Sequence, residues 1–303
     1  MAIGLQTYGD TSRREDLISL LKDVSPLGGN YLYGNLGDTT ASQTVHQWPV
    51  LHIARATSVT FVAEGADATV VDHTAPGRSD NVTGILARTV RVTGTEAEVA
   101  TATGRDPMAH QKEIAMKQLA QDIEFALVNG TKASGASGVA RGMAGLDGVI
   151  SSHMTARASG TSMSVTEIED IMQSVWDNVD GGFTGKTLLV PMGVARKISS
   201  FTTNITNYVN ETDKLYRNIK TFQGSAGEVK IVPHKDVRKT AGTATVYLIN
   251  EDMFRVAYLR KPFWKSLAVN GDYEVGQYLT ELTLESLAEK SSAKRTGYRI
   301  ESD

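Results

Sequence analysis

One stretch of the sequence approaches a nucleotide-binding motif. "DGGFTGKT", residues 180–187, has the glycines, lysine and threonine of a loop whose backbone amides cradle phosphate groups. Asp180, however, occupies the position of the first glycine. The stretch also runs into the strand-like "TLLVP", whereas a phosphate-binding loop follows a strand and opens a helix. We therefore interpret it as a tight turn between a helix and a strand.

Two further stretches match elements of penicillin-recognising serine enzymes. Ser291 and Lys294 match Ser-x-x-Lys, in which a lysine activates a serine nucleophile, and Ser79-Asp80-Asn81 matches a second element. The two elements occur in the reverse of the usual order, and the Lys-Thr-Gly element is missing. Chance explains the match, so we expect no catalytic residue here.

A metal site is equally unsupported by the sequence. No two histidines are four residues apart, the His-Glu-x-x-His pattern does not occur, and there is no cysteine to supply a thiolate. The six histidines are scattered: His46, His52, His73, His110, His153 and His234. We expect no metal, no cofactor and no enzymatic activity.

Composition narrows the class of protein further. A chain of 303 residues with 41% hydrophobic residues can bury a substantial core. Its net charge of −3 gives no general attraction to nucleic acid or to an anionic membrane. No run approaches the roughly 18 apolar residues of a membrane-spanning helix, so we expect no membrane partner.

The most regular stretch, residues 106–129, predicts one long helix. Asp106 can accept hydrogen bonds from the first amides, and Pro107 suits the first helical position. Gly130 is expected to end the helix in a left-handed conformation. The rod would be on the order of 35 Å long. Residues at three- and four-residue steps form an apolar stripe that we expect to pack: Met116, Leu119, Ile123 and Leu127.

Shorter elements are expected on both sides of this helix. Capping pairs predict a short helix over residues 12–21 and a longer one that starts at Ser164 or Thr166 and ends before Gly181. The Gly-, Ala- and Ser-rich linker 132–150 suggests a domain boundary. Runs rich in β-branched and apolar residues predict strands within 56–63, 84–95, 187–191, 229–233, 245–250, 253–259 and 275–287.

The region between residues 48 and 105 reads as a long two-armed β excursion with a polar tip. It has too few large apolar residues to fold over a core of its own. Segments that cannot bury their own surface are explained if neighbouring copies of the chain bury it for them. That is how the subunit of a shell is built.

Several blocks of the sequence, taken in order, resemble a known family. They are "FVAEGADAT", "RTVRVTGTEAEV", "HQKEIAMKQLAQDIEFALVNG", "ARGMAGLDGVI", "KIVPHKDV", "VYLINEDMFRVAYLRKPF" and "NGDYEVGQYLTELTLESLAEKSSAKRTGY". Over about residues 45–300 the chain is similar to the major capsid proteins of tailed bacteriophages, in the SU-ten-like group. Glu124, near the end of the long helix, and Glu281, in the late strand, stand at the expected places.

The resemblance implies an α+β chain with the Hong Kong 97-type (Johnson) capsid fold, whose long helix is called the spine helix. We expect five regions: an N-terminal arm at 1–47, an extended β loop at 48–105, a peripheral domain at 106–160 with the spine helix at 106–129, an axial domain at 161–268, and C-terminal strands at 269–303 that return to the peripheral domain.

The resemblance also implies a function. Hexamers and pentamers of such subunits form an icosahedral shell around double-stranded DNA, which they hold without sequence specificity. The shell belongs to a virion and its subunits are made in the host bacterial cytoplasm, with portal, scaffolding or decoration proteins as possible partners. The alternatives are an encapsulin-type nanocompartment shell and, more remotely, a soluble enzyme.

Three arginines are candidates for contacts between subunits. Arg78 lies in the β excursion, and Arg88 and Arg91 lie on its returning arm, "ILARTVRV". A strand with little core beneath it should direct long cationic side chains toward whatever covers it. We expect Arg88 and Arg91 to contact a neighbouring subunit instead of their own.

Overall fold

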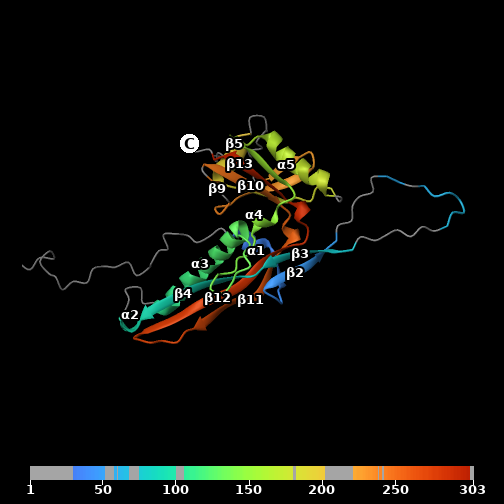
Figure 1. Cartoon of the computed structure of the whole chain (residues 1–303). Coiled ribbons are helices and arrows are strands. Elements are labelled where there is room, and N and C mark those ends of the chain that lie inside the picture. The colour runs from blue at the N-terminus through green and yellow to red at the C-terminus, as the bar shows by residue number, and fades with distance from the viewer. Residues whose placement is uncertain are drawn as a thin grey trace, which may run out of the picture.

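Figure 1 shows the computed structural model, in which two units lie one above the other and a long loop stands away from both. The structure describes residues 30–51, 58–59, 61–67, 75–99, 106–179, 182–201, 221–237, 239–240 and 242–300. The helix expected over residues 12–21 and the first part of the arm lie outside the described residues.

Helix α3 (Pro107–Asn129) is the long helix that the sequence predicts. A carboxylate oxygen of Asp106 accepts the amide of Met108 at 2.9 Å, and Pro107 is the first helical residue. Gly130 follows the last turn, but its φ of −55° is not left-handed, so that part of the expectation is wrong. Glycine is needed there for space: a Cβ would lie 2.4 Å from the carbonyl oxygen of Ala126 and 2.6 Å from that of Met143.

The lower unit is a four-stranded sheet with α3 on one face (Figure 1). Along the third strand the side chains alternate, so that Leu282 and Leu284 enter the core beneath α3 while Glu281 and Thr283 point to the opposite face. In spatial order the strands are β1 (Gly37–Thr40), β11 (Phe254–Ser266), β12 (Tyr273–Ser286) and β4 (Gly84–Thr93). The short helices of this unit are α1 (Tyr31–Asn35), α2 (Gly94–Glu98) and α4 (Leu146–Val149).

Strand β11 is only partly covered by a neighbour on its outer side. β1 pairs with it in parallel from Arg255 to Tyr258 and no further. Beyond that point β11 pairs with β12 through two register shifts, one between Tyr258 and Arg260 and one between Arg260 and Phe263. The exposed Pro262 lies within the second shift.

The upper unit is a second sheet with helices on one face. Strand β10 (Thr243–Ile249) lies near its centre, and its buried run "TVYLI" explains the strand prediction for this segment. Helices α5 (Val165–Asn178) and α6 (Met192–Ser199) cover one face of the sheet, and Ser164 caps α5 as expected. The other strands are β5 (Met154–Thr161), β6 (Thr187–Val190), β7 (Thr221–Gly224), β8 (Gly227–Pro233), β9 (Lys239–Thr240) and β13 (Ala293–Arg299).

One hydrophobic core joins the two units. Alternation along β10 sends Val246 and Leu248 toward α5 and α6, and Tyr247 and Ile249 toward the end of α3. The second set packs with Ile123 of α3 and with apolar residues of α1, β11 and β12. The C-terminal half of α3 is therefore covered on several sides, whereas its N-terminal half rests mainly on β4.

The path of the chain differs from the expected domain boundaries. β11 lies in the lower sheet beside β12, although residues 161–268 were expected to form one domain. β13, expected in the lower unit, pairs with β10 and β5 of the upper sheet. The chain crosses between the units at 150–154, 250–254 and 286–293. Strand patterns do not say which sheet a strand joins, because pairing between distant segments sets that choice.

The expected β excursion is a two-stranded ribbon with a loop. β2 (Val45–Val50) and β3 (Gly77–Val82) pair with each other in antiparallel register, while β4 joins the lower sheet. A strand was expected within residues 56–63, but the described residues 58–59 and 61–63 are not in a strand. They lie in the long loop that Figure 1 shows at a distance from both units.

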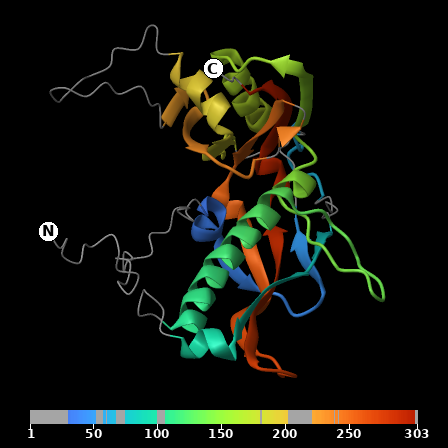
Figure 2. The same ribbon diagram turned by 90° about the vertical axis from the view of Figure 1, so that its left-hand side faces the viewer.

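The apolar stripe of α3 is buried over most of its length. Leu119, Ile123 and Leu127 are between 0% and 2% exposed. Met116 was expected to pack with them, but it is 59% exposed, so this expectation is wrong. The face of α3 that carries Met116 is covered only toward the C-terminal end of the helix, where α1 and the upper unit contact α3 (Figure 2).

These exposures predict opposite outcomes for one substitution made at two positions. Leu119→Asp places a charge in the core and should destabilise the fold by several kcal/mol, on the order of its whole stability. Met116→Asp, on the same helix, should change the free energy of unfolding by less than about 0.5 kcal/mol. Denaturant unfolding followed by circular dichroism measures both. A cooperatively folded Leu119→Asp variant would contradict the assignment of the buried face.

Candidate functional site

Glu124 is a buried carboxylate on α3 at the point where three parts of the chain meet. Its Oε1 accepts the amide of Leu32 and its Oε2 the amide of Tyr33, each at 2.8 Å. His234, which follows β8 of the upper unit, lies with Nε2 at 2.6 Å from Oε1. The side chains of Glu124 and His234 are each 1% exposed. One side chain of the spine thus binds the first turn of α1 and the upper unit.

The hydrogen bonds of His234 define its tautomer. The amide of Asp236 donates to Nδ1 at 3.1 Å, so Nδ1 carries no proton and Nε2 is the donor to Glu124. Three donors therefore face the Glu124 carboxyl group, an arrangement that suits the anion. Tyr31, also in α1, donates its hydroxyl to Glu251 at 2.7 Å, which gives α1 a second attachment.

Glu281 forms a comparable centre on the opposite face of the lower sheet. Its side chain is 4% exposed and receives Arg141 at 2.6 Å, Arg260 at 2.9 Å and the hydroxyl of Thr83 at 3.0 Å. Arg141 comes from a small hairpin, residues 133–142, within the segment 132–150 that the sequence suggested was a surface linker. The ion pairs attach this hairpin to β11 and β12.

Asn81 connects the root of the ribbon to the core. Its Nδ2 donates to the carbonyl oxygens of Ala144 and Leu284 at 3.0 and 2.8 Å, and its Oδ1 accepts the amides of Ala144 and Val82 at 2.9 Å each. All four hydrogen-bonding positions of the amide are therefore used. The chance match Ser79-Asp80-Asn81 thus contains a structural residue.

Arg88 and Arg91 contact their own subunit, so the expectation that they do not is wrong. Arg88 makes two parallel bonds with Asp122 of α3, at 2.5 and 2.6 Å. The guanidinium of Arg91 lies 3.7 Å from the ring centre of Tyr273 on the neighbouring strand. Both partners become adjacent only through long-range packing. Arg78 is exposed and pairs with no other described residue.

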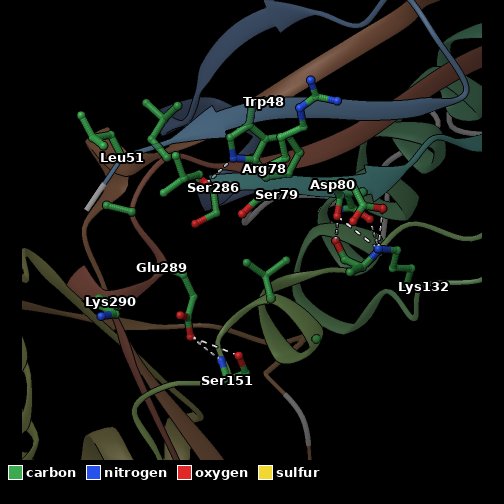
Figure 3. Close-up of a pocket in the computed structure, with 17 residues that line it drawn as sticks. Trp48, Leu51, Arg78, Ser79, Asp80, Lys132, Ser151, Ser286, Glu289 and Lys290 are labelled. Carbon is green, nitrogen blue, oxygen red and sulfur yellow. Dashed lines mark hydrogen bonds and ion pairs between the residues drawn. The ribbon is translucent and has the colours of Figure 1, made fainter. Parts of the chain in front are cut away.

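A groove of about 520 Å³ runs beneath the ribbon, between β2 and β3 on one side and α4 and the β12–β13 connection on the other (Figure 3). Trp48 lies in its wall and donates its indole N–H to the carbonyl oxygen of Ser286 at 2.7 Å. Leu51 and Val149 add apolar surface, and Arg78 and Lys290 lie on opposite sides of the groove (Figure 3).

Glu289, on the lower side of this groove, fastens two crossing segments together. It accepts the amides of Ser151 and Ser152 at 2.6 and 2.5 Å and the Ser152 hydroxyl at 2.6 Å. Burial alone would raise the pKa of Glu289, but these hydrogen bonds and nearby His153 hold it below its ordinary value. Burial of the His153 ring in turn lowers the pKa of that residue.

The residues singled out for chemistry are not assembled into a site. Lys294 donates to the carbonyl oxygen of Asp147 at 2.5 Å, and Ser291 donates to that of Ala288 at 2.7 Å, so each is engaged with backbone. Within the part of the chain that the structure describes, no group of histidine and carboxylate side chains could hold a metal ion. Over the same residues, no helix has the length and apolar character of a membrane span.

Comparison with known proteins identifies the family. The family model described as "SU10 major capsid protein" matches residues 4–299. The chain belongs to this family. It is therefore a capsid shell protein, and it is located in the virion. Among curated proteins, none matches the chain in sequence.

Solved structures agree with the Hong Kong 97-type fold. The capsid asymmetric unit of cyanophage A-1(L) is 14% identical, with a TM-score of 0.66 over 98% of this chain and 99% of that one. The capsid of Myoviridae phage XM1 is 12% identical, with a TM-score of 0.61 over 93% and 96%. The holo-SrpI encapsulin complex of Synechococcus elongatus is 10% identical, with a TM-score of 0.62 over 99% and 98%. At these identities the likeness shows the fold alone.

Loss of the Glu124 carboxylate should destabilise the capsid protein more than loss of an exposed one. Glu124→Ala leaves two amides of α1 and the Nε2 proton of His234 buried without an acceptor, which should cost about 3 kcal/mol or more. Glu113→Ala, on the exposed face of the same helix, should cost less than about 0.5 kcal/mol, because its pair with Lys117 is exposed to solvent. Equal unfolding free energies for the two variants would contradict the role of Glu124.

The lowered pKa of Glu289 predicts a loss of stability in acid. Between the folded pKa and the ordinary value of 4.5, the unfolded chain binds more protons, so stability is present above about pH 4.5 and is lost as pH falls through the folded pKa. Glu289→Gln should be less stable than wild type at neutral pH, and the difference should shrink as the pH falls below about 4.5. Chemical denaturation at several pH values measures this difference. A constant difference would show that the carboxylate is not the cause.

Proposed function

We propose that this capsid protein forms hexamers and pentamers that assemble into an icosahedral shell around double-stranded DNA. The observation that carries the proposal is the family match over residues 4–299. The fold supports it, because the described loop residues 61–67 leave the subunit's own core and provide surface for neighbouring copies to cover. The subunit would be made in the host bacterial cytoplasm and would have no enzymatic activity.

The contact with DNA would be non-specific in sequence. The net charge of −3 offers no overall attraction for the phosphate backbone, so the shell would enclose DNA without binding it strongly. Portal, scaffolding or decoration proteins are candidate further partners of the shell. We assign the two sheets to peripheral and axial domains, and Arg78 to a contact between subunits.

An encapsulin-type compartment is the second candidate, because an encapsulin shares the fold at a TM-score of 0.62. The two functions differ in what the shell contains. A genome container holds nuclease-protected DNA, whereas a nanocompartment holds protein. The family match favours the first.

Expression of the full chain in bacteria tests the proposal directly. We expect closed particles of uniform size by negative-stain electron microscopy and fast sedimentation. Particles recovered from phage-infected cells should contain nuclease-protected DNA. A chain that stays monomeric under all conditions would refute the shell function, and uniform particles that carry only a protein cargo would favour the nanocompartment.

A further inference from the structure

The sequence contains two Asn-Gly pairs, Asn129-Gly130 and Asn270-Gly271. In such a pair the backbone nitrogen of the glycine can attack the side-chain carbonyl carbon, Cγ, of the asparagine. Glycine favours this attack because it has no Cβ to obstruct the approach and because its backbone is unusually free to turn. The two pairs have the same intrinsic reactivity, so a difference between them must come from the fold.

The reaction converts the side-chain amide into a carboxylate. A bond forms between the glycine nitrogen and Cγ, and the bond from Cγ to Nδ2 breaks. The glycine nitrogen gives up its proton, Nδ2 gains one, and ammonia leaves. The resulting cyclic imide then takes up one water molecule at either of its carbonyl carbons. The products are aspartate and isoaspartate, in which the main chain runs through the former side chain, and water is the only co-reactant.

The end of α3 holds Asn129-Gly130 in an unreactive arrangement. Nδ2 of Asn129 donates to the carbonyl oxygen of Asp236 at 2.5 Å, which fixes the side chain. The amide of Gly130, the attacking group, donates to the carbonyl oxygen of Ala126 at 2.9 Å. Attack on Cγ therefore requires both hydrogen bonds to break and the last turn of the helix to open.

No such restraint acts on Asn270-Gly271. The pair lies in the turn between β11 and β12, at the end of the lower unit away from the upper unit (Figures 1 and 2). Both residues are exposed and belong to no helix or strand. Among the described residues, neither Nδ2 of Asn270 nor the amide of Gly271 has a hydrogen-bond partner. Attack at this pair thus breaks no hydrogen bond between described residues.

We propose that Asn270 is a site of spontaneous deamidation in the folded subunit, whereas Asn129 is protected until the end of α3 opens. The nitrogen of Gly271 is the nucleophile. The inference concerns the chemistry of the chain itself and does not depend on what the shell contains. Because the reaction is irreversible and slow, the converted fraction rises with the time since synthesis, and the turn records the age of a subunit.

Conversion changes the surface of the turn and leaves the core intact. It places a new carboxylate beside the exposed Asp272 and Glu274. Isoaspartate also adds one carbon to the main chain, in a turn where the carbonyl oxygen of Asp272 accepts the amide of Gly94 at 3.2 Å. Gly94 is the first residue of α2, so the change acts on the contact between the turn and this short helix.

Peptide mapping by mass spectrometry tests the proposal on the purified full-length chain. One sample is kept folded at mildly alkaline pH and another is kept in concentrated urea. In urea both pairs should convert at similar rates. In the folded chain Asn270 should convert at a rate similar to that in urea, whereas Asn129 should convert at least about tenfold more slowly than in urea, because the helix must open first.

Two outcomes would overturn the inference. One is an Asn270 peptide that stays unconverted in the folded chain while the denatured chain converts, and the other is an equal rate for the two pairs in the folded chain. Labelling by an isoaspartyl methyltransferase, which transfers a methyl group only to isoaspartate, identifies the product independently. The readout is on the chain itself, so a failure of shell assembly would refute the proposed function and leave this result unchanged.

Matched variants identify the reacting groups. Asn270→Gln should abolish the conversion, because glutamine must close a larger ring. Gly271→Ala should slow it, because a Cβ obstructs the nitrogen; this Cβ would meet only the ring of Tyr273, at 3.1 Å, so the fold should tolerate it. Asn178, which is exposed but followed by Val179, should stay unconverted in both variants and in the wild type. An unchanged rate in Gly271→Ala would contradict attack by the glycine nitrogen.

Discussion

The buried carboxylate of Glu124 requires hydrogen-bond donors, and the packing of this capsid fold depends on the segments that provide them. Glu124 lies near the C-terminal end of α3 and takes two amides from α1 and one imidazole N–H from His234. None of the three donors belongs to α3 itself. Burying an unpaired carboxylate would cost more than a domain can bear, so α1 and the upper unit must both be in place when the spine is packed.

The same logic extends outward from Glu124. Glu281 gathers a hairpin, β11 and the root of β4, and Glu289 fastens two of the crossing segments. Glu124, Glu281 and Glu289 lie in different parts of the structure, but each forms hydrogen bonds or ion pairs with segments that are distant in sequence. Hydrophobic packing joins the two units, and the carboxylates define how the crossing segments sit against one another.

The sequence was most informative where structure is local. The start of α3 follows from Asp106 and Pro107, and the cap of α5 from Ser164, because each rests on hydrogen bonds within one turn. The fold as a whole was recognisable only through resemblance. Which sheet β11 and β13 join was mispredicted, because strand patterns carry no information about distant partners.

The candidate site was harder to predict for the same reason. Glu124 and Glu281 could be placed by resemblance, but His234, Arg141 and the amides of α1 become their partners only in three dimensions. Arg88 was predicted to contact a neighbouring subunit because nothing in the sequence identifies Asp122 as its partner. The exposure of Met116 depends on how far α1 reaches along α3, which helical periodicity does not encode.

The outer side of β11 has a consequence for a protein made in many copies. Past Tyr258 this strand has no described neighbour on that side, and a flat, bare edge would invite the same edge of another copy to pair with it. Pro262 removes a donor from the edge, the two register shifts bend it, and Lys261 and Lys265 add like charges. These features disfavour edge-to-edge pairing of this strand between copies of the chain, a route that leads to open-ended aggregates.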